Sequence, residues 1–194
     1  NRQFKMIGIL ENDSETGMNY YDDRLEKTSG DGFYIGSCIV EKRNGIEDVI
    51  KEGNYITLQN RRGEQLLMTI MTLDETSETI YITYEDIGLD LINGYINELT
   101  EPVNPQPVSY YLEETLKGTG WKVGTVETIE ALKLEFTKQQ SILERLQEII
   151  KAFGGLPKYS VEFDGLRVKD FFVHVLKPRD SYKTVRFDTD VNIN

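Results

Sequence analysis

The sequence is poor in the residues that most often carry chemistry. It holds one cysteine, Cys38, one histidine, His174, and one tryptophan, Trp121, among 194 residues. One cysteine excludes an intramolecular disulfide framework, and one histidine excludes the paired-histidine zinc motifs. No run approaches the roughly 20 apolar residues of a membrane-spanning helix. We therefore expect a chain with no metal site, no cofactor and no membrane contact, long enough to bury a core of its own.

Basic residues are also scarce, and their shortage is uneven. The chain carries 22 Lys and Arg against 33 Asp and Glu, a formal net charge of −11. Residues 1–100 hold 9 bases against 19 acids, whereas the remainder is close to neutral. Such a surface repels the phosphate backbone, which disfavours ordinary nucleic-acid binding. Two interpretations stay open: a solubilising surface, or a wall that nucleic acid passes without adhering.

The first 84 residues have the composition of a small β-barrel or sandwich. Runs rich in β-branched and aromatic residues alternate with turn segments such as TSGDG and NRRG. Only IEDVIKEG (46–53) is typical of a helix here. The expected strands are FKMIGIL (4–10), DGFYIGSCIV (31–40), NYITL (54–58), QLLMTIMTL (65–73) and TIYITY (79–84).

Residues 85–180 change character and predict an α+β domain of three helices and a small antiparallel sheet. The first helix is expected in YEDIGLDLINGYINEL (84–99), and the proline-rich TEPVNPQP (100–107) is a connector that no helix interior tolerates. Ser109 is a plausible N-cap for a second helix over 110–117, which Gly118 would end. The apolar face expected for the first helix comprises Ile87, Leu91, Ile92, Ile96 and Leu99.

The stretch KGTGWKVG (117–124) surrounds the tryptophan with glycine. Gly120 permits a tight reversal, and Trp121, Val123 and Thr125 then alternate with Lys122 and a glycine, the period of a half-buried strand. We interpret Trp121 as a core residue that docks a helix onto a strand. A ligand platform is the alternative.

The third helix, expected in 137–155, carries the clearest periodicity of the chain. Thr137 and Gln140 fit a capping box at its start, and Gly154 and Gly155 follow its end. The apolar stripe consists of Ile142, Leu143, Leu146, Ile149, Ile150 and Phe153.

The segment that follows this helix predicts a β-hairpin. Residues 158–176 alternate apolar and polar side chains, and Asp164 with Gly165 is a strong signal for a two-residue turn. Residues 181–194 resume a strand pattern.

No catalytic signature stands out. His174 has no G-x-S-x-G partner, so a strand histidine with a structural or surface role is expected. The acidic loop ENDSETGMNYYDD (11–23) aligns poorly with a calcium-binding loop, which needs more carboxylates and a final glutamate. Paired carboxylates for glycoside hydrolysis are not marked by any pattern, and no phosphate-binding loop is present.

The order of several short stretches resembles a known family, the amino-terminal region of phage tail-associated lysins, or prophage endopeptidase tail proteins. The likeness extends over nearly the whole chain, and GTGW after a helix is its most distinctive element. The stretches are YYDDRLEK, DGFYIG, IEDVIKEGNYITL, EDIGLDLINGYI, YYLEETLKGTGWKVG, SILERLQEIIKAFGG and YSVEFDG.

This resemblance implies an architecture similar to baseplate hub proteins. A tube-like β-barrel over residues 1–84 would carry an α+β domain over 85–180, and residues 181–194 would open a second β tube domain. In the virion, three copies would form a ring that continues the tail tube and surrounds the DNA channel. The isolated chain would be either a trimer or a monomer. The implied partners are the distal tail and tape-measure proteins, and the implied location is the virion tail tip of a prophage-encoded particle. Peptidase or glycan-degrading activity would lie in downstream segments, so no catalytic residue is carried over.

Three hypotheses follow. The first is a non-enzymatic tail-tip protein that joins the tail tube to modules facing the cell wall. The second is a glycan-binding module that uses exposed tyrosines and Trp121 as stacking platforms. The third is a hydrolase with an unmarked pair of carboxylates. We expect the first, with no catalytic, metal or cofactor residues.

Overall fold

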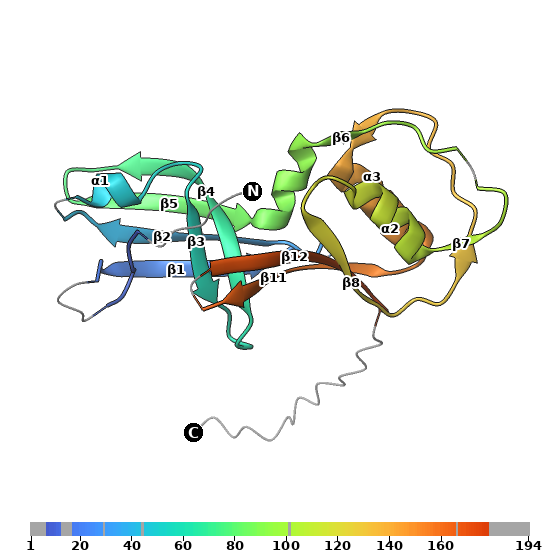
Figure 1. The fold of residues 1–194 in the computed structure, drawn as a ribbon. Coiled ribbons are helices and arrows are strands. Elements are labelled where there is room, and N and C mark those ends of the chain that lie inside the picture. Colours follow the sequence, from blue (N-terminus) through green and yellow to red (C-terminus); the bar gives the residue numbers. More distant parts are fainter. Residues whose placement is uncertain are drawn as a thin grey trace, which may run out of the picture.

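The structure is a computed structural model that describes residues 7–12, 17–28, 30–43, 45–100, 102–165 and 167–178. The chain is mixed α+β, as expected (Figure 1). It contains two hydrophobic cores. One core lies against a five-stranded sheet, and the other lies between helices and a three-stranded sheet. Residues 181–194 lie outside the described residues, and the domain boundaries inferred above stay predictions.

The five-stranded sheet is antiparallel and has the order β1-β2-β5-β4-β3. Figure 1 shows it curling, so that β3 and β4 stand steeply across β1 and β2. This half-barrel agrees with the expected β architecture, whereas closure into a barrel stays a prediction. The strands are β1 (Tyr20–Lys27), β2 (Tyr34–Glu41), β3 (Tyr55–Gln59), β4 (Gln65–Glu75) and β5 (Thr79–Asp86).

Alternation along these strands places apolar side chains on the concave side of the sheet. The short helix α1 (Ile46–Val49), expected from the sequence, covers part of that side, with Ile46 and Ile50 buried. The buried residues of this core are Cys38, Val40, Ile46, Ile50, Leu66, Met68, Ile70, Ile80, Ile82 and Tyr84.

Two expectations about the amino-terminal strands are wrong. In the described part of FKMIGIL, residues 7–10, a single bridge between Leu10 and Met18 replaces the expected strand. The acidic YYDDRLEK, not expected to be a strand, forms β1. A bulge between Tyr21 and Arg24, with Asp22 at a φ of 51°, keeps the apolar side chains of this strand on the concave side.

The prediction of a helix over residues 84–99 is also wrong, in both the type and the length of the helix. A 3₁₀ helix, η1 (Ile87–Asn93), ends before Gly94, and β6 (Tyr95–Ile96) follows. A Cβ on Gly94 would lie 2.5 Å from Ile142 Cδ1, and the Gly94 carbonyl accepts the N–H of Ile142. This close approach to the third helix ends η1, and Ile92 is left 53% exposed instead of joining the apolar face.

The helix α2 (Val108–Leu116) begins earlier than the sequence indicates. Its N-cap is Pro107 and not Ser109, and no side chain caps it. Gly118 and Gly120 have φ values of 80° and 87°, so the predicted termination and reversal before β8 (Trp121–Val126) are confirmed.

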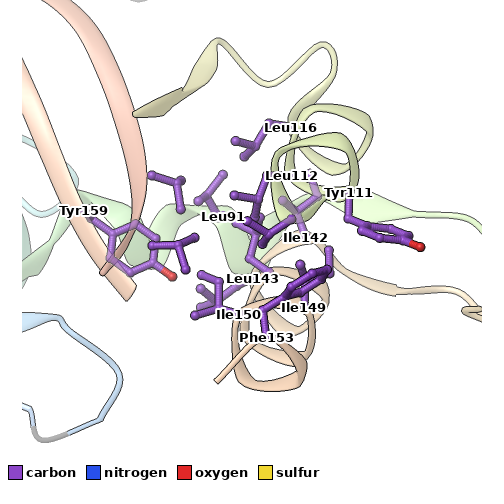
Figure 2. Packing of buried hydrophobic residues seen from close by; sticks show 14 of the residues in the cluster. Leu91, Tyr111, Leu112, Leu116, Ile142, Leu143, Ile149, Ile150, Phe153 and Tyr159 are labelled. Carbon is purple, nitrogen blue, oxygen red and sulfur yellow. The ribbon is translucent and has the colours of Figure 1, made fainter. Parts of the chain in front are cut away.

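The helix α3 (Ile142–Ala152) carries the predicted apolar stripe into the second core. Its capping box is formed by Ser141 and Glu144, so the prediction of Thr137 with Gln140 is wrong. The chain before the helix is extended, as β10 (Gln140–Ser141) paired with β6, and this places Ser141 at the N-cap. Figure 2 shows the side chains of α2 and α3 meeting in the core, among them Leu112, Ile149 and Phe153.

Arg145, on α3, is a buried cation that the sequence analysis missed. Its side chain is 0% exposed, and its guanidinium lies 4.0 Å from the Phe136 ring. Nε donates to Gln140 at 2.6 Å, and one terminal nitrogen donates to the carbonyl of Asn97 at 3.1 Å. Burial lowers its pKa. Arg145 thereby ties two connecting segments to the helix.

The three-stranded sheet has the order β11-β12-β8 and supports these helices. The strands β11 (Leu156–Asp164) and β12 (Arg167–Leu176) form the predicted hairpin, and Gly165 at its turn has a φ of 59°. The strand β8 joins β12 in parallel, with Trp121 opposite Phe171. A small sheet pairs β7 (Gln106–Pro107) with β9 (Ala131–Leu132).

The capping geometry predicts an asymmetry between two similar substitutions. Ser141→Ala removes the side chain that accepts the Glu144 N–H, so it should lower the free energy of unfolding by about 1 kcal/mol. Thr137→Ala, at an exposed position outside the helix, should change it by less than about 0.5 kcal/mol. Chemical denaturation of both variants checks this, and equal losses would contradict the assignment of the cap.

Candidate functional site

The five-stranded sheet has two different faces, and both are candidates for contact with other molecules. The concave side opens as a groove of about 1420 Å³ that runs from α1 to the β11–β12 turn. The outer face, on the opposite side, carries polar and charged side chains. We refer to these surfaces as the groove and the outer face.

The strands contribute to the groove in different ways. Every residue from Asn54 to Arg62, which includes all of β3, lines it. By contrast, β1 contributes mainly alternate residues, among them Leu25 and Lys27. A strand that lines a cavity with consecutive residues presents its edge, and one that does so with alternate residues presents a face. The groove is therefore bounded by the edge of β3 and floored by the apolar face of β1, β2 and β5.

Rows of directly paired residues define the outer face. One row joins Tyr21, Ile39, Tyr81 and Asp74 across β1, β2, β5 and β4. In a second row, Arg24, Ser37, Thr83 and Thr72 are aligned, and the hydroxyls of the two threonines lie 2.7 Å apart. A third row joins Glu26, Ile35 and Glu85.

Acidic side chains prevail on this outer face. The rows bring together Glu26, Asp74 and Glu85, and Glu41 follows on the same face by alternation, against Arg24 as the cation. Burial, and to a lesser degree the charge of Asp90, raises the pKa of Glu85. Since α1 packs on the concave side and α2 and α3 belong to the second core, none of these helices covers the outer face.

The junction between the two cores is tightly packed. Phe33, which precedes β2, stacks on Tyr159 of β11 with ring centroids 4.5 Å apart. A Cβ on Gly88 would lie 2.9 Å from both rings, so glycine permits this contact. Phe33 thus lies in the second core, although its sequence position is among the β strands.

Charged groups complete the junction. Lys158 forms an ion pair with Glu64, and Asn60 donates to the same carboxylate at 2.8 Å. The hydrogen bond from Lys158 is the main cause that lowers the pKa of Glu64. Nearby, burial raises the pKa of Asp86 to about 6, against the opposing effect of the Gly88 N–H, which it accepts at 2.9 Å.

His174 links strands in the three-stranded sheet. Its Nδ1 accepts the N–H of Thr125 at 2.8 Å, so the neutral ring carries its proton on Nε2. Nε2 lies 2.7 Å from Ser160 Oγ and donates to it. Burial, with a smaller effect of Lys158, lowers the pKa of His174. The structural role predicted from the sequence fits these contacts.

Trp121 lies in the second core, as predicted, and not in an open groove. Its ring is half-buried, 5.1 Å from the Phe171 ring and 6.1 Å from the Tyr159 ring, the latter edge to face. It packs against the cluster that α2 and α3 form. This arrangement answers why glycines precede it: they turn the chain sharply from α2 into β8.

The remaining sequence candidates carry no site among the described residues. Residues 13–16 of the acidic loop lie outside them, and in the described part of the chain no three His, Cys, Asp or Glu gather where a metal ion would bind. Cys38 is buried at the floor of the groove, and burial is the main cause that raises its pKa to about 12. No helix in the described ranges is long and apolar enough to cross a membrane.

Sequence reasoning missed the outer face because it did not recognise β1 as a strand. The pairing of β1 with β2 is what aligns Tyr21 and Glu26 with residues of β5. A signal was available in YYDDRLEK, where Tyr20 and Leu25 are apolar positions separated by charged residues. The bulge between them breaks the period of two, so the alternation is hidden.

Comparison with known proteins agrees with this architecture. The model of the prophage endopeptidase tail domain matches residues 105–164. A search of the curated proteins found no match. The resemblance to the prophage endopeptidase tail family, drawn from the sequence, is thereby confirmed.

Three solved structures share the fold. The tail protein from Neisseria meningitidis MC58 matches with a TM-score of 0.53 and 10% identity, over 80% of this chain and 44% of that one. The 43 kDa tail protein of prophage MuSo2 from Shewanella oneidensis matches with a TM-score of 0.50 and 16% identity, over 77% of this chain and 48% of that one. The prophage tail protein gp18 from Listeria monocytogenes EGD-e matches with a TM-score of 0.55 and 13% identity, over 88% of this chain and 49% of that one. The chain spans about half the length of the solved structures that it matches.

The packing of Trp121 predicts a stability effect. Trp121→Ala removes contacts with two rings in the core, so it should lower the free energy of unfolding by about 2–4 kcal/mol. Tyr95→Ala, at a side chain that is 70% exposed, should cost less than about 0.5 kcal/mol. Denaturant titration compares them, and a neutral effect of the tryptophan substitution would contradict its place in the core.

The hydrogen bonds of His174 predict a pH-dependent difference. His174→Phe keeps an aromatic ring but removes both bonds, so at pH 7.5 it should lower the free energy of unfolding by about 1–2 kcal/mol. Because the folded-state pKa of His174 lies below its ordinary 6.5, this stabilisation is present above pH 6.5 and lost as the pH falls through the folded-state value.

The difference between the two proteins should therefore shrink on acidification. The contribution of Asp86 to the free energy of unfolding changes with pH in the opposite direction. Because its pKa is raised in the folded state, Asp86 adds stability at low pH, and this stability is lost as the pH rises through about 6. Both proteins contain Asp86, so its contribution cancels when their free energies of unfolding are compared. Denaturant titrations from pH 8 to pH 5 measure the difference, and a constant value would contradict a neutral, hydrogen-bonded ring.

Proposed function

We propose, from the premise that residues 105–164 carry a prophage endopeptidase tail domain, that this chain is a structural protein of the phage tail tip. In this proposal it is similar to a baseplate hub: three copies form a ring that continues the tail tube, surrounds the DNA channel and joins the tube to modules facing the cell wall. The curled sheet would supply a tube-like barrel, and the α+β part would brace it. The distal tail and tape-measure proteins would be its neighbours.

The observation that carries this proposal is the outer face. It is a broad β surface on which acids prevail over bases and which α1, α2 and α3 leave uncovered. Double-stranded DNA carries about one negative charge per 1.7 Å of its axis. Lysines and arginines on a channel wall would hold the DNA through its phosphates, whereas acids and hydroxyls let it pass without adhering. We assign the outer face to the lumen of the ring.

The proposed role requires no chemistry from these residues. We propose that the chain is not an enzyme and that any peptidase or glycan-degrading activity belongs to segments beyond it. Stability of the junction suits such a role, because a wall subunit has to hold its two cores in a constant arrangement. Phe33, Tyr159 and the ion pair between Lys158 and Glu64 supply that connection.

The glycan-binding alternative has less support. Its strongest candidate platform, Trp121, packs against Phe171 and Tyr159. A stacking platform needs an open aromatic face. Tyr21 and Tyr81 are exposed, but they share the outer face with carboxylates in a paired row.

The number of subunits in the assembly and the orientation of the outer face within it test the proposal together. At high protein concentration, sedimentation should show a trimer, and electron cryomicroscopy should show a three-fold ring with Glu26, Asp74 and Glu85 toward its lumen. The physical reason is that DNA passage requires a wall without phosphate-binding cations. A monomer at every concentration, both for this chain and for a longer chain that extends beyond residue 194, would contradict it. A ring whose lumen is lined by lysine and arginine would also contradict it.

A peptidoglycan sedimentation assay on the same sample serves as the control for the alternative. Co-sedimentation of a monomer with peptidoglycan would favour glycan binding. Absence of co-sedimentation together with a ring is the result that the proposal predicts.

A further inference from the structure

The parallel pairing of β8 with β12 is interrupted at its centre. The register shifts between Val173 and Val175 of β12. Two residues of β8, Gly124 and Thr125, therefore lie opposite His174 alone, and such a bulge disrupts the backbone ladder locally. The N–H of Thr125 donates instead to Nδ1 of His174 at 2.8 Å. A side chain thus supplies the acceptor at this point of the sheet.

Glycine at position 124 allows the imidazole to lie against the backbone of β8. A Cβ on Gly124 would be 2.5 Å from both Nδ1 and Cε1 of His174, which is closer than such atoms pack. On the other side of the ring, Nε2 donates to Ser160 Oγ of β11 at 2.7 Å. The half-buried ring is therefore held between the two strands that flank β12.

We propose that His174 is a pH-dependent switch that holds the centre of β8 on the three-stranded sheet and releases it when the ring is protonated. An imidazolium carries a proton on both nitrogens and cannot accept a hydrogen bond. Its Nδ1–H would face the N–H of Thr125, so two donors would meet where one hydrogen bond now lies. Either the ring turns away or the strand moves, and both movements free the amide of Thr125.

The surroundings of the ring keep it neutral at pH 7. Burial and, to a smaller degree, the charge of Lys158, which is paired with His174 across the sheet, lower the pKa of His174. Carboxylates of the surrounding elements already have partners and do not offset this effect. These pairs are Glu162 with Lys169, Asp170 with Lys122, Glu64 with Lys158, and Glu127 with the N–H of Lys177. The hydrogen bond to Thr125 is therefore present above pH 6.5 and lost as the pH falls through the folded-state pKa.

Release of β8 would affect one edge of the molecule. In the strand order of the described residues, β8 is an edge strand next to β12, so its centre can separate without breaking another strand pair. Trp121, at the start of β8, would keep that end attached through Phe171 and Tyr159. Opening would expose backbone N–H and C=O groups of β12, as any uncovered edge does. The switch needs neither a ring of subunits nor a partner, so it stands apart from the proposed function.

Hydrogen exchange of the full 194-residue chain, read by NMR from pH 7.5 to pH 5, tests this switch, with the ring signals of His174 reporting its protonation. After correction for the intrinsic exchange rate at each pH, protection of the Thr125 amide should fall at least about tenfold as the ring titrates. Amides of β5, in the other core, should keep their protection. Unchanged protection of Thr125 after the ring has titrated, or an equal fall along β5, would overturn the switch.

Three variants separate the ring from its surroundings. His174→Asn places an acceptor near the position of Nδ1 that does not titrate in this range, so protection of Thr125 should vary little with pH. Gly124→Ala keeps His174 but displaces its ring, so Thr125 should exchange rapidly at both ends of the range. Ser160→Ala removes only the hydrogen bond of Nε2 and should leave the pH response in place.

Two results with these variants would contradict the switch. One is a pH response of Thr125 that persists in His174→Asn, because the ring would then not be its cause. The other is full protection of Thr125 in Gly124→Ala, because the position of the ring against β8 would then not matter.

Discussion

The segregation of side chains between the two faces of the five-stranded sheet is the constraint on which the rest of the structure depends. Pairing aligns Val40, Ile80 and Cys38 with apolar neighbours on the concave side and leaves acids and hydroxyls on the outer face. A shift by one residue in any pairing would reverse the two sides of that strand. The groove, the acidic surface and the position of α1 all follow from this register.

The second core holds the sheet in place and explains several local features of the sequence. Glycines occur where backbone and ring or helix approach closely, as Gly88 does against Phe33 and Gly94 against Ile142. Arg145 is buried by stacking on an aromatic ring and by donating to nearby oxygens. Burial of this cation makes the packing of the second core specific at a cost in desolvation.

Much of the fold was predictable from periodicity, whereas features set by distant contacts were not. The stripe from Ile142 to Phe153, the hairpin at Gly165 and the place of Trp121 followed from local patterns. The helix expected over 84–99 failed because Gly94 meets α3, and no sequence window reveals that contact. For the outer face, the sequence predicted only an excess of acidic residues and not their position on the sheet. The bulge in β1 interrupts the alternation of polar and apolar residues, so this segment was not recognised as a strand.

The central claim is that the sheet presents an exposed acidic outer face and buries apolar side chains on its concave side. Hydroxyl-radical footprinting of the full chain tests both at once, residue by residue. The account predicts rapid oxidation of Tyr21 and Tyr81 on the outer face and protection of Ile80 and Ile82 on the concave side. Rapid oxidation of Ile80 and Ile82, with Tyr21 and Tyr81 protected in the monomer, would contradict it.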